Sequence, residues 1–200
     1  MPSIGTIVFT NPDESFIEIA GGSHIWHDVE IHASSFTEVI DLGFEVGSAG
    51  SLNFMPGAGP IDLSGGGNLT IRNTTAAGIT GYGNDAYVIG YAPSVPATNG
   101  LRRYLTPTGQ FDFPVGTWSA GYQLARVRFS APTSINHLTA TFVDNDFAGQ
   151  GSLIGAGCSG TFQDYLDNGY WRIEADANGS TGMYALNLLN INYSNAGPGD

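Results

Sequence analysis

The sequence predicts an all-β protein in which the terminal coils of a right-handed β-helix (solenoid) are followed by an antiparallel β-sandwich. Three observations predict this class. Short runs of alternating or paired apolar residues recur along the chain, the residues between them are rich in Gly, Asn, Ser and Pro, and no stretch has helical periodicity. The 29 glycines also disfavour helices, since a glycine inside a helix costs up to about 1 kcal/mol.

The first predicted region, residues 1–92, carries a loose repeat of β-like runs. Paired apolar positions recur at roughly 8 to 13 residues, or at about 20 residues when two runs are taken together. They begin at Ile17, Val29, Val39, Leu52, Ile61 and Leu69. In a β-helix, short strands stack on those of the next coil and small residues form the corners. The same runs also fit a β-sandwich with ordinary hairpins, but few of the turns have two-residue hairpin signals, which favours the solenoid.

A break in composition at "PSVPATN", residues 93–99, predicts a linker between two domains. Residues 100–200 are then predicted to form the β-sandwich, because several alternating strands separated by turn signals follow one another. The chain ends in the turn-forming stretch "YSNAGPGD", with no further strand to close a sheet. We therefore expect the sandwich to be truncated at its C-terminus and the chain to be a piece of a longer protein.

The stretch "FDFPVGTWSAGYQLARVRF" is expected to supply the core of the sandwich. Its first part places Phe111, Phe113 and Val115 on one face of a strand, where their burial would stabilise the fold by roughly 1.5–3 kcal/mol for each aromatic ring. Pro114 and Gly116 are expected to end the pairing of this strand, because proline cannot donate to a central ladder.

The second part of the same stretch alternates strictly between apolar and polar positions. Val127 and Phe129 are expected to face the core, and Arg126 and Arg128 the solvent. The stretch as a whole therefore predicts a structural element and not a reaction centre.

Composition limits the partners of the chain. There are 18 acidic residues against 6 arginines and no lysine, giving a net charge of −12, which repels nucleic acids and anionic lipid headgroups. No apolar run reaches the 18 residues of a membrane span, so we expect no membrane insertion. The surface is polar mainly through amides and hydroxyls, which favours a location outside the cell. The single cysteine, Cys158, has no partner within the chain and is expected to be a free thiol or to pair with a residue beyond it.

Several motifs occur in a fixed order in the second half of the chain: "AYVIGYA", "LRRYL", "GQFDFPVGT", "GYQLARVRF", "NGYWRIEA" and "GMYALNLL". This ordered set resembles a β-solenoid/β-sandwich module of large secreted or cell-surface proteins of Bacteroidota, which are exported by the type IX secretion system. The resemblance covers most of the chain from about Leu69 onward. It implies a structural, adhesive or stalk-forming segment at the cell surface or in the extracellular space, with no family activity attached. The C-terminal sorting domain of such proteins does not occur in this sequence, so this export route is an expectation.

Two kinds of metal site are suggested by the sequence. In "SHIWHDVEIH", a strand would point Asp28, Glu30 and His32 the same way, although such a row is also typical of the solvated face of a coil. Calcium fits two Gly-containing loops better, because it prefers oxygen ligands. The candidate calcium ligands are Asp144, Asp146, Asp176 and Asn178. Neither loop completes a twelve-residue calcium motif, and Asn178-Gly179 also reads as an ordinary tight turn, so the expectation is no cofactor other than calcium.

An enzyme is not expected. Some β-helices are polysaccharide lyases or hydrolases that use clustered carboxylates, and Asp41, Glu45 and Asp62 are the candidates here. However, the chain has no lysine, only Arg72 among its arginines precedes residue 100, and no G-x-S-x-G motif occurs.

A carbohydrate-binding module is the stronger alternative to a purely structural segment. Exposed aromatic side chains stack on sugar rings, and the candidates are Trp118, Tyr122, Tyr165, Tyr170 and Trp171. Trp118, in the turn "GTWSAG", is the first choice, because binding residues are often carried on turns. Tyr122 is the second. The expected partners are glycans or other cell-surface proteins.

Overall fold

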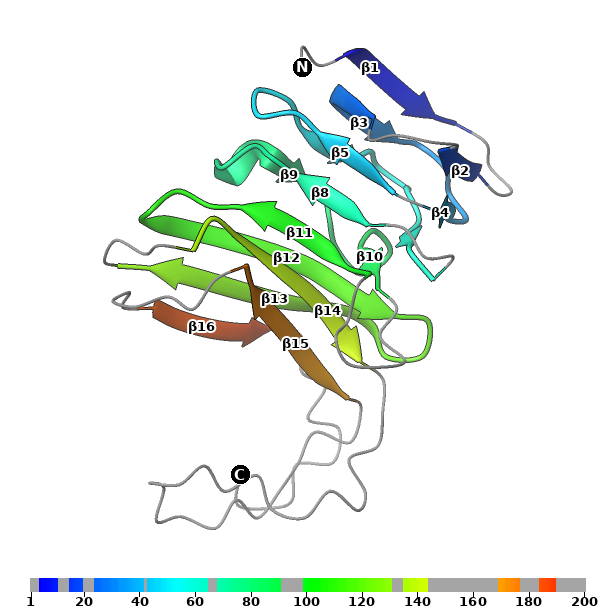
Figure 1. Ribbon diagram of the computed structural model, residues 1–200. Helices are drawn as coiled ribbons and strands as arrows, with labels where there is room; N and C mark the ends of the chain where they lie inside the picture. The colour runs from blue at the N-terminus through cyan, green and yellow to red at the C-terminus, as the bar shows by residue number, and fades with distance from the viewer. Residues whose placement is uncertain are drawn as a thin grey trace.

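The computed structural model describes residues 4–10, 15–19, 24–41, 43–64, 68–90, 99–130, 135–143, 169–176 and 184–189 (Figure 1). The regular secondary structure of these parts consists of β-strands and one short 3-10 turn. The strands of the N-terminal part are β1 (Ile4–Phe9), β2 (Ser15–Ile19), β3 (Ile25–Ile31), β4 (Thr37–Asp41), β5 (Phe44–Val46), β6 (Leu52–Phe54), β7 (Ile61–Asp62), β8 (Leu69–Ile71), β9 (Ile79–Thr80) and β10 (Val88–Ile89). The later strands are β11 (Leu101–Tyr104), β12 (Gly109–Thr117), β13 (Gly121–Phe129), β14 (His137–Val143), β15 (Tyr170–Ala175) and β16 (Tyr184–Leu189). One 3-10 turn, η1 (Ala76–Gly78), precedes β9.

The strands form two sheets. Sheet A has the order β15-β14-β11-β8-β5-β3-β6-β9, with β1 paired to β3, and sheet B has the order β16-β13-β12-β10-β7-β4-β2. Up to β12 the chain winds repeatedly between the two sheets, with two successive strands in sheet A at β5 and β6 and again at β8 and β9, and every pairing between these coils is parallel. In Figure 1 the coils follow one another from β1 at the top to β11 and β12 further down. The all-β class and the solenoid-like stacking are therefore confirmed.

Successive coils are somewhat longer than the repeat expected from the sequence. Asp28 and Ser51 hydrogen-bond between neighbouring coils and lie 23 residues apart, and Asn53 and Thr80 do so 27 residues apart. The repeat of about 20 residues was short because it took two runs together, whereas these coils contain three strands each, β5 to β7 and then β8 to β10. The six predicted runs fall on β2, β3, β4, β6, β7 and β8, whereas β1, β5 and β9 were not predicted.

The pairing changes from parallel to antiparallel after β12. A turn at residues 118–120 joins β12 to β13, which pairs antiparallel with β12 and in turn with β16. In sheet A, β14 pairs antiparallel with β11, and β15 with β14. Both sheets thus continue from the parallel coils into the antiparallel strands. Of the linker predicted at 93–99, only residue 99 is among the described residues, and β11 and β12 beyond it still stack in parallel on β8 and β10.

The expectation that Pro114 and Gly116 end the pairing of their strand is wrong. Pro114 lies opposite Leu124 and Gly116 opposite Tyr122, and the ladder between β12 and β13 continues to Thr117. A proline removes one N–H group from one edge of a strand only, so the remaining residues can still hold the ladder together.

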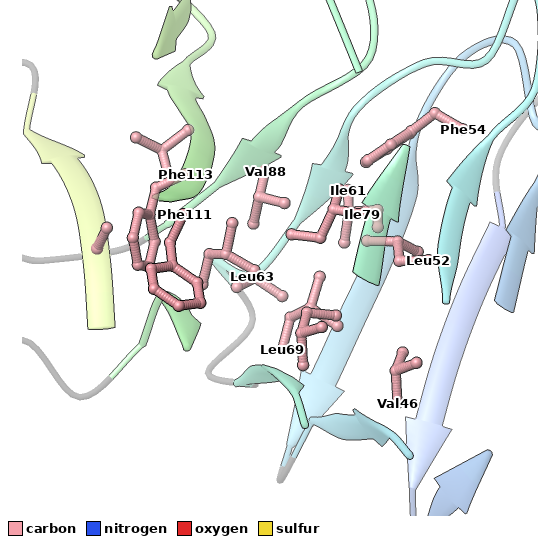
Figure 2. Close-up of a cluster of buried hydrophobic side chains, with 14 of the residues drawn as sticks. Val46, Leu52, Phe54, Ile61, Leu63, Leu69, Ile79, Val88, Phe111 and Phe113 are labelled. Carbon is pink, nitrogen blue, oxygen red and sulfur yellow. The ribbon is translucent and has the colours of Figure 1, made fainter. Parts of the chain in front are cut away.

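The core is a continuous cluster of side chains that point inward from both sheets (Figure 2). Phe111, Phe113 and Phe129 are 1%, 0% and 4% exposed, and Val127 is buried with them. Arg128, in contrast, is exposed. The predicted inward and outward positions of this stretch are therefore confirmed.

A buried arginine connects the two sheets within this core. Arg103, on β11 of sheet A, is 1% exposed, and its Nη1 donates to the carbonyl oxygen of Asp112 on β12 at 2.8 Å. Its Nη2 donates to the carbonyl oxygen of Thr75 at 2.8 Å. Burial lowers the pKa of Arg103 to about 10, so that the guanidinium is still charged at neutral pH. The sequence did not predict that Arg103 is buried, because it is identical to its neighbour Arg102, which points to the other face of β11.

Within the described parts of the chain, no helix has the length and apolar character needed to cross a membrane. Cys158 lies outside the described residues, as does the C-terminal stretch on which the expected truncation was based.

Candidate functional site: an aromatic platform on sheet B

Five aromatic side chains gather on the outer face of sheet B, and we call this group the aromatic platform. Its members are Phe36, Tyr82, Tyr87, Trp118 and Tyr122. Tyr122 lies within β13, Phe36 and Tyr87 directly precede β4 and β10, Trp118 lies in the turn after β12, and Tyr82 follows β9. The inward row across β4, β7, β10 and β12 is fully buried and consists of Thr37, Ile61, Val88 and Val115. The residues next to this row therefore point to the outer face.

Trp118 is the most exposed member of the platform. Its side chain lies in the turn between β12 and β13 and is 57% exposed. The indole Nε1 donates to Oδ2 of Asp62 at 3.1 Å, and the ring of Phe36 meets the indole edge-on, with centroids 5.4 Å apart. Asp62 is itself only 6% exposed, and its Oδ1 accepts a hydrogen bond from the backbone N–H of Ser64 at 2.8 Å. Trp118 is thus held in place while much of its surface remains open to solvent.

The tyrosines of the platform depend on a glycine beneath them. A Cβ atom on Gly116 would lie 2.8 Å from the ring of Tyr87 and 2.1 Å from the carbonyl oxygen of Gly121. The hydroxyl of Tyr87 donates to the carbonyl oxygen of Thr117 at 3.2 Å, next to Trp118. The ring of Tyr122 lies 6.2 Å from that of Tyr87 and 6.5 Å from that of Tyr82. Gly116 therefore makes room for an aromatic ring and does not end the strand.

An ion pair borders the tyrosines. Arg126 donates from Nε and Nη2 to the two carboxylate oxygens of Asp112 at 2.6 and 2.8 Å, and the hydroxyl of Tyr82 donates to the same carboxylate at 2.5 Å. Burial by itself would raise the pKa of Asp112, but these hydrogen bonds outweigh it and hold the pKa below its usual value. Burial and the charge of Asp112 raise the pKa of Tyr122 to about 12. The platform therefore combines neutral phenols with an ionised Asp112 at neutral pH.

This ion pair predicts a specific loss of stability in acid. Because the pKa of Asp112 is lower in the folded than in the unfolded state, its contribution is complete above about pH 3.8 and is lost as the pH falls through the folded-state value. Asp112→Asn is expected to lower the free energy of unfolding by about 1–3 kcal/mol at neutral pH and to flatten its decline below pH 3.8, as measured by urea unfolding at several pH values. Asp85→Asn, at an exposed aspartate, is the control and should leave both unchanged. Parallel acid profiles for wild type and Asp112→Asn would contradict the assignment.

The structure places both predicted ligand-binding residues on the platform. Trp118 lies in a turn and is exposed, as predicted, and Tyr122 is half-buried on the same face. Trp171 instead packs edge-on against Phe142 at 5.0 Å, on sheet A. Tyr165 lies outside the described residues.

The calcium hypothesis meets a different arrangement at Asp176. Asp144, Asp146 and Asn178 lie outside the described residues. The carboxylate of Asp176 accepts hydrogen bonds from the backbone N–H and the Nδ2 of Asn136, at 3.0 and 2.9 Å. Within the described ranges no group of three or more His, Cys, Asp or Glu side chains is arranged to hold a metal ion.

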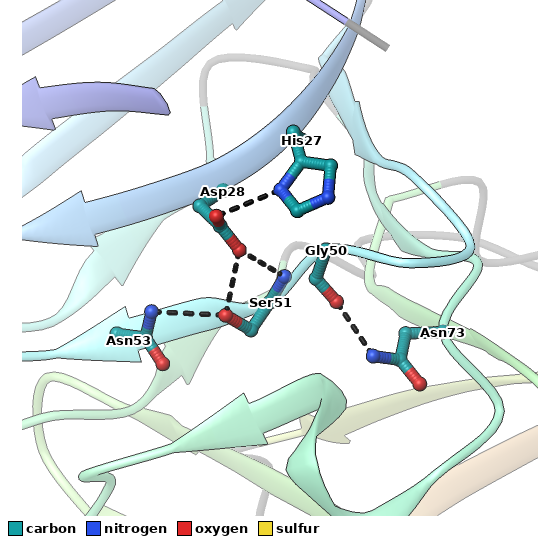
Figure 3. A network of polar contacts seen from close by, with 6 residues as sticks. All are labelled: His27, Asp28, Gly50, Ser51, Asn53 and Asn73. Atoms are coloured by element: carbon teal, nitrogen blue, oxygen red, sulfur yellow. Dashed lines mark hydrogen bonds and ion pairs between the residues drawn. The ribbon is translucent and has the colours of Figure 1, made fainter. Parts of the chain in front are cut away.

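The histidine-rich row on β3 is used for contacts within and between coils. Nδ1 of His27 lies 2.7 Å from Oδ2 of Asp28, whose Oδ1 accepts hydrogen bonds from both the backbone N–H and the hydroxyl of Ser51, each at 2.9 Å (Figure 3). Nε2 of His32 lies 3.0 Å from Oε2 of Glu30. Asp28 therefore links two neighbouring coils through its hydrogen bonds with Ser51.

The carboxylates considered for glycosidase or lyase chemistry do not come together. Glu45 is on β5 of sheet A and pairs with Arg72 at 2.5 Å, whereas Asp62 is on β7 of sheet B and holds Trp118. Asp41 is on β4, in sheet B.

Sequence reasoning missed three members of the platform: Phe36, Tyr82 and Tyr87. It also treated Asp62 as a catalytic candidate, although this residue positions Trp118. The signal that would have helped is the coil repeat, since residues one coil apart become neighbours on one face. Comparison of the chain with protein-family models, curated proteins and solved structures gives no match.

Proposed function

We propose that the chain is a non-catalytic structural or adhesive segment of a bacterial surface or secreted protein, and that the aromatic platform is its glycan-binding surface. The observation that carries the proposal is the state of Trp118, which is 57% exposed and yet fixed by Asp62 and Phe36. A large exposed aromatic side chain on a fixed support is typical of recognition surfaces. Because the indole is already ordered, binding a ligand would cost little conformational entropy of the Trp118 side chain.

The chemistry around Trp118 suits a sugar. The C–H face of a pyranose ring is apolar and stacks on an aromatic ring, while its hydroxyls need hydrogen-bonding groups at the rim. Glu38 lies opposite Asp62 on the neighbouring strand and adds a half-buried carboxylate. The hydroxyl of Ser119, next to Trp118, adds a donor and an acceptor on the exposed side of the turn. The half-buried ring of Tyr122 extends the aromatic surface along the sheet.

The architecture supports a structural role. Parallel coils that share one core form an extended stack, because each coil contacts its neighbours along both sheets. We take these coils to be right-handed and the antiparallel strands β13 to β16 to be the β-sandwich that follows them. The amide-rich surface, and the resemblance of the ordered motifs to those of secreted Bacteroidota proteins, support an extracellular location. The non-catalytic assignment is supported by Glu45 and Asp62, which lie on different sheets.

Trp118→Ala is expected to weaken glycan binding at least about tenfold, because a central aromatic anchor commonly carries this much of the binding free energy. A glycan array identifies the ligand, and titration calorimetry then compares the variants. Trp118→Phe should retain part of the affinity, since it keeps a ring but loses the hydrogen bond to Asp62. The thermal midpoint of Trp118→Ala should change little, because the side chain is mostly exposed.

Tyr104→Ala is the matched control for this experiment. Tyr104 is a half-buried aromatic residue on sheet A, away from the platform, where it packs against Arg72 and His137. Its removal should leave glycan binding unchanged. The proposal fails if the wild-type chain binds no glycan on a broad array, or if Trp118→Ala binds as tightly as wild type.

A further inference from the structure

A pocket of about 330 Å³ opens on the outer face of sheet A, away from the aromatic platform. The side chains around it are those of Asn68, Arg102, His137, Thr139, Glu174 and Asp176. The strand register explains this grouping. Arg102 pairs with Thr139, and Thr139 pairs with Glu174, so these three residues form one outward row across β11, β14 and β15.

The carboxylates of this pocket are engaged by donors of the protein. Oε1 of Glu174 accepts a hydrogen bond from Nε of Arg172 at 2.7 Å. Asp176 accepts two hydrogen bonds from Asn136 and one from the backbone N–H of His137 at 3.3 Å. Burial, with Arg102 beside it, holds the pKa of His137 below its usual value although Asp176 opposes this shift, so the imidazole is neutral at pH 7.

Arg102 lines this pocket without forming an ion pair, whereas three other arginines of the described chain each form one. Arg72, Arg126 and Arg172 each pair with an acidic side chain. Among the described residues, Arg102 has no carboxylate within ion-pair distance, and its one hydrogen bond runs from Nε to Oγ1 of Thr139 at a long 3.4 Å. The two terminal nitrogens of its guanidinium are thus available in a pocket that has room for a small molecule.

We propose that this pocket binds a hydroxylated monocarboxylate of the uronic acid type, with the guanidinium of Arg102 receiving the carboxylate. An arginine holds a planar carboxylate through two parallel N–H groups, which lysine cannot do. Asn68, Thr139 and the second carboxylate oxygen of Glu174 supply donors and acceptors for hydroxyl groups.

The charge of the surroundings disfavours a dianion more than a monoanion. Glu174 and Asp176 line the same pocket, and the whole chain carries a net charge of −12. A dianionic phosphate would be repelled more strongly than a carboxylate with one negative charge. This site lies on the opposite sheet from the aromatic platform and does not depend on the glycan binding proposed there.

The test is a titration of the full chain with sodium glucuronate, followed by two-dimensional ¹H–¹⁵N NMR. We expect saturable shifts at the amides of residues 137 and 139 and at least about tenfold weaker binding for Arg102→Gln. Arg102→Lys should recover only part of the affinity, because it keeps the charge without the paired N–H groups. Arg128→Gln is the matched control, since Arg128 is an exposed arginine on sheet B, and it should bind like wild type.

Three further arms identify the ligand chemistry. The neutral methyl ester of glucuronate should not bind, and acetate should bind more weakly than glucuronate because it lacks hydroxyls. Trp118→Ala should leave the glucuronate shifts unchanged, which separates this site from the platform. The proposal is overturned if the ester binds as well as the acid, or if Arg102→Gln retains wild-type affinity. Equal affinity for acetate and glucuronate would overturn the hydroxyl contacts.

Discussion

Replacing Phe113 with alanine is expected to lower the free energy of unfolding by about 3–5 kcal/mol. Phe113 is 0% exposed and lies within the cluster of buried side chains (Figure 2). It is on β12, which pairs in parallel with β10 on one edge and antiparallel with β13 on the other. Its ring therefore fills the core at the point where the parallel coils meet the antiparallel strands. Truncation would remove buried apolar surface and leave a cavity, because the strands on both sides fix the backbone.

Urea unfolding followed by circular dichroism measures this change. Leu186→Ala is the control, since Leu186 is an apolar residue that is 44% exposed on β16, and it should change the free energy by no more than about 0.5 kcal/mol. A loss below about 1 kcal/mol for Phe113→Ala would show that the ring is not in a packed core.

Gly50→Ala is expected to cost about 3 kcal/mol or more, because there is no space for a side chain between two coils. A Cβ atom on Gly50 would lie 1.3 Å from the carbonyl oxygen of His27 in the neighbouring coil. On its other side, the carbonyl oxygen of Gly50 accepts a hydrogen bond of 2.6 Å from Nδ2 of Asn73, in the next coil (Figure 3). The backbone of Gly50 is therefore held between two neighbours that belong to the chain itself and cannot rotate away.

Gly57→Ala separates this effect from the conformational preference of glycine. Gly57 has a φ angle of 83°, but a Cβ there would meet nothing within 4 Å. Alanine at this site should cost only about 1–2 kcal/mol, the penalty of a left-handed backbone. If Gly50→Ala were no more destabilising than Gly57→Ala in urea unfolding, the close stacking of the coils would be disproved.

The alternation of residues within single strands was readable in the sequence. Val127 and Phe129 face the core because they alternate with the two arginines, and Phe111 and Phe113 follow the same rule on β12. The turn that carries Trp118 was also predicted correctly, because Gly and Ser surround it. The end of pairing at Pro114 was predicted wrongly, since local composition does not show which edge of a strand needs its N–H group.

The sequence by itself thus determined the class of the fold, most of the strands and the faces of β12 and β13 on which their side chains lie, because these depend on neighbours one or two positions away. Only the tertiary structure decided which distant residues meet. Asp62 and Trp118 are 56 residues apart, and Arg102 reaches the row of Glu174 through β14. Such contacts depend on the register between strands, which the lengths of the coils and the packing of the shared core set together, and no local pattern records it.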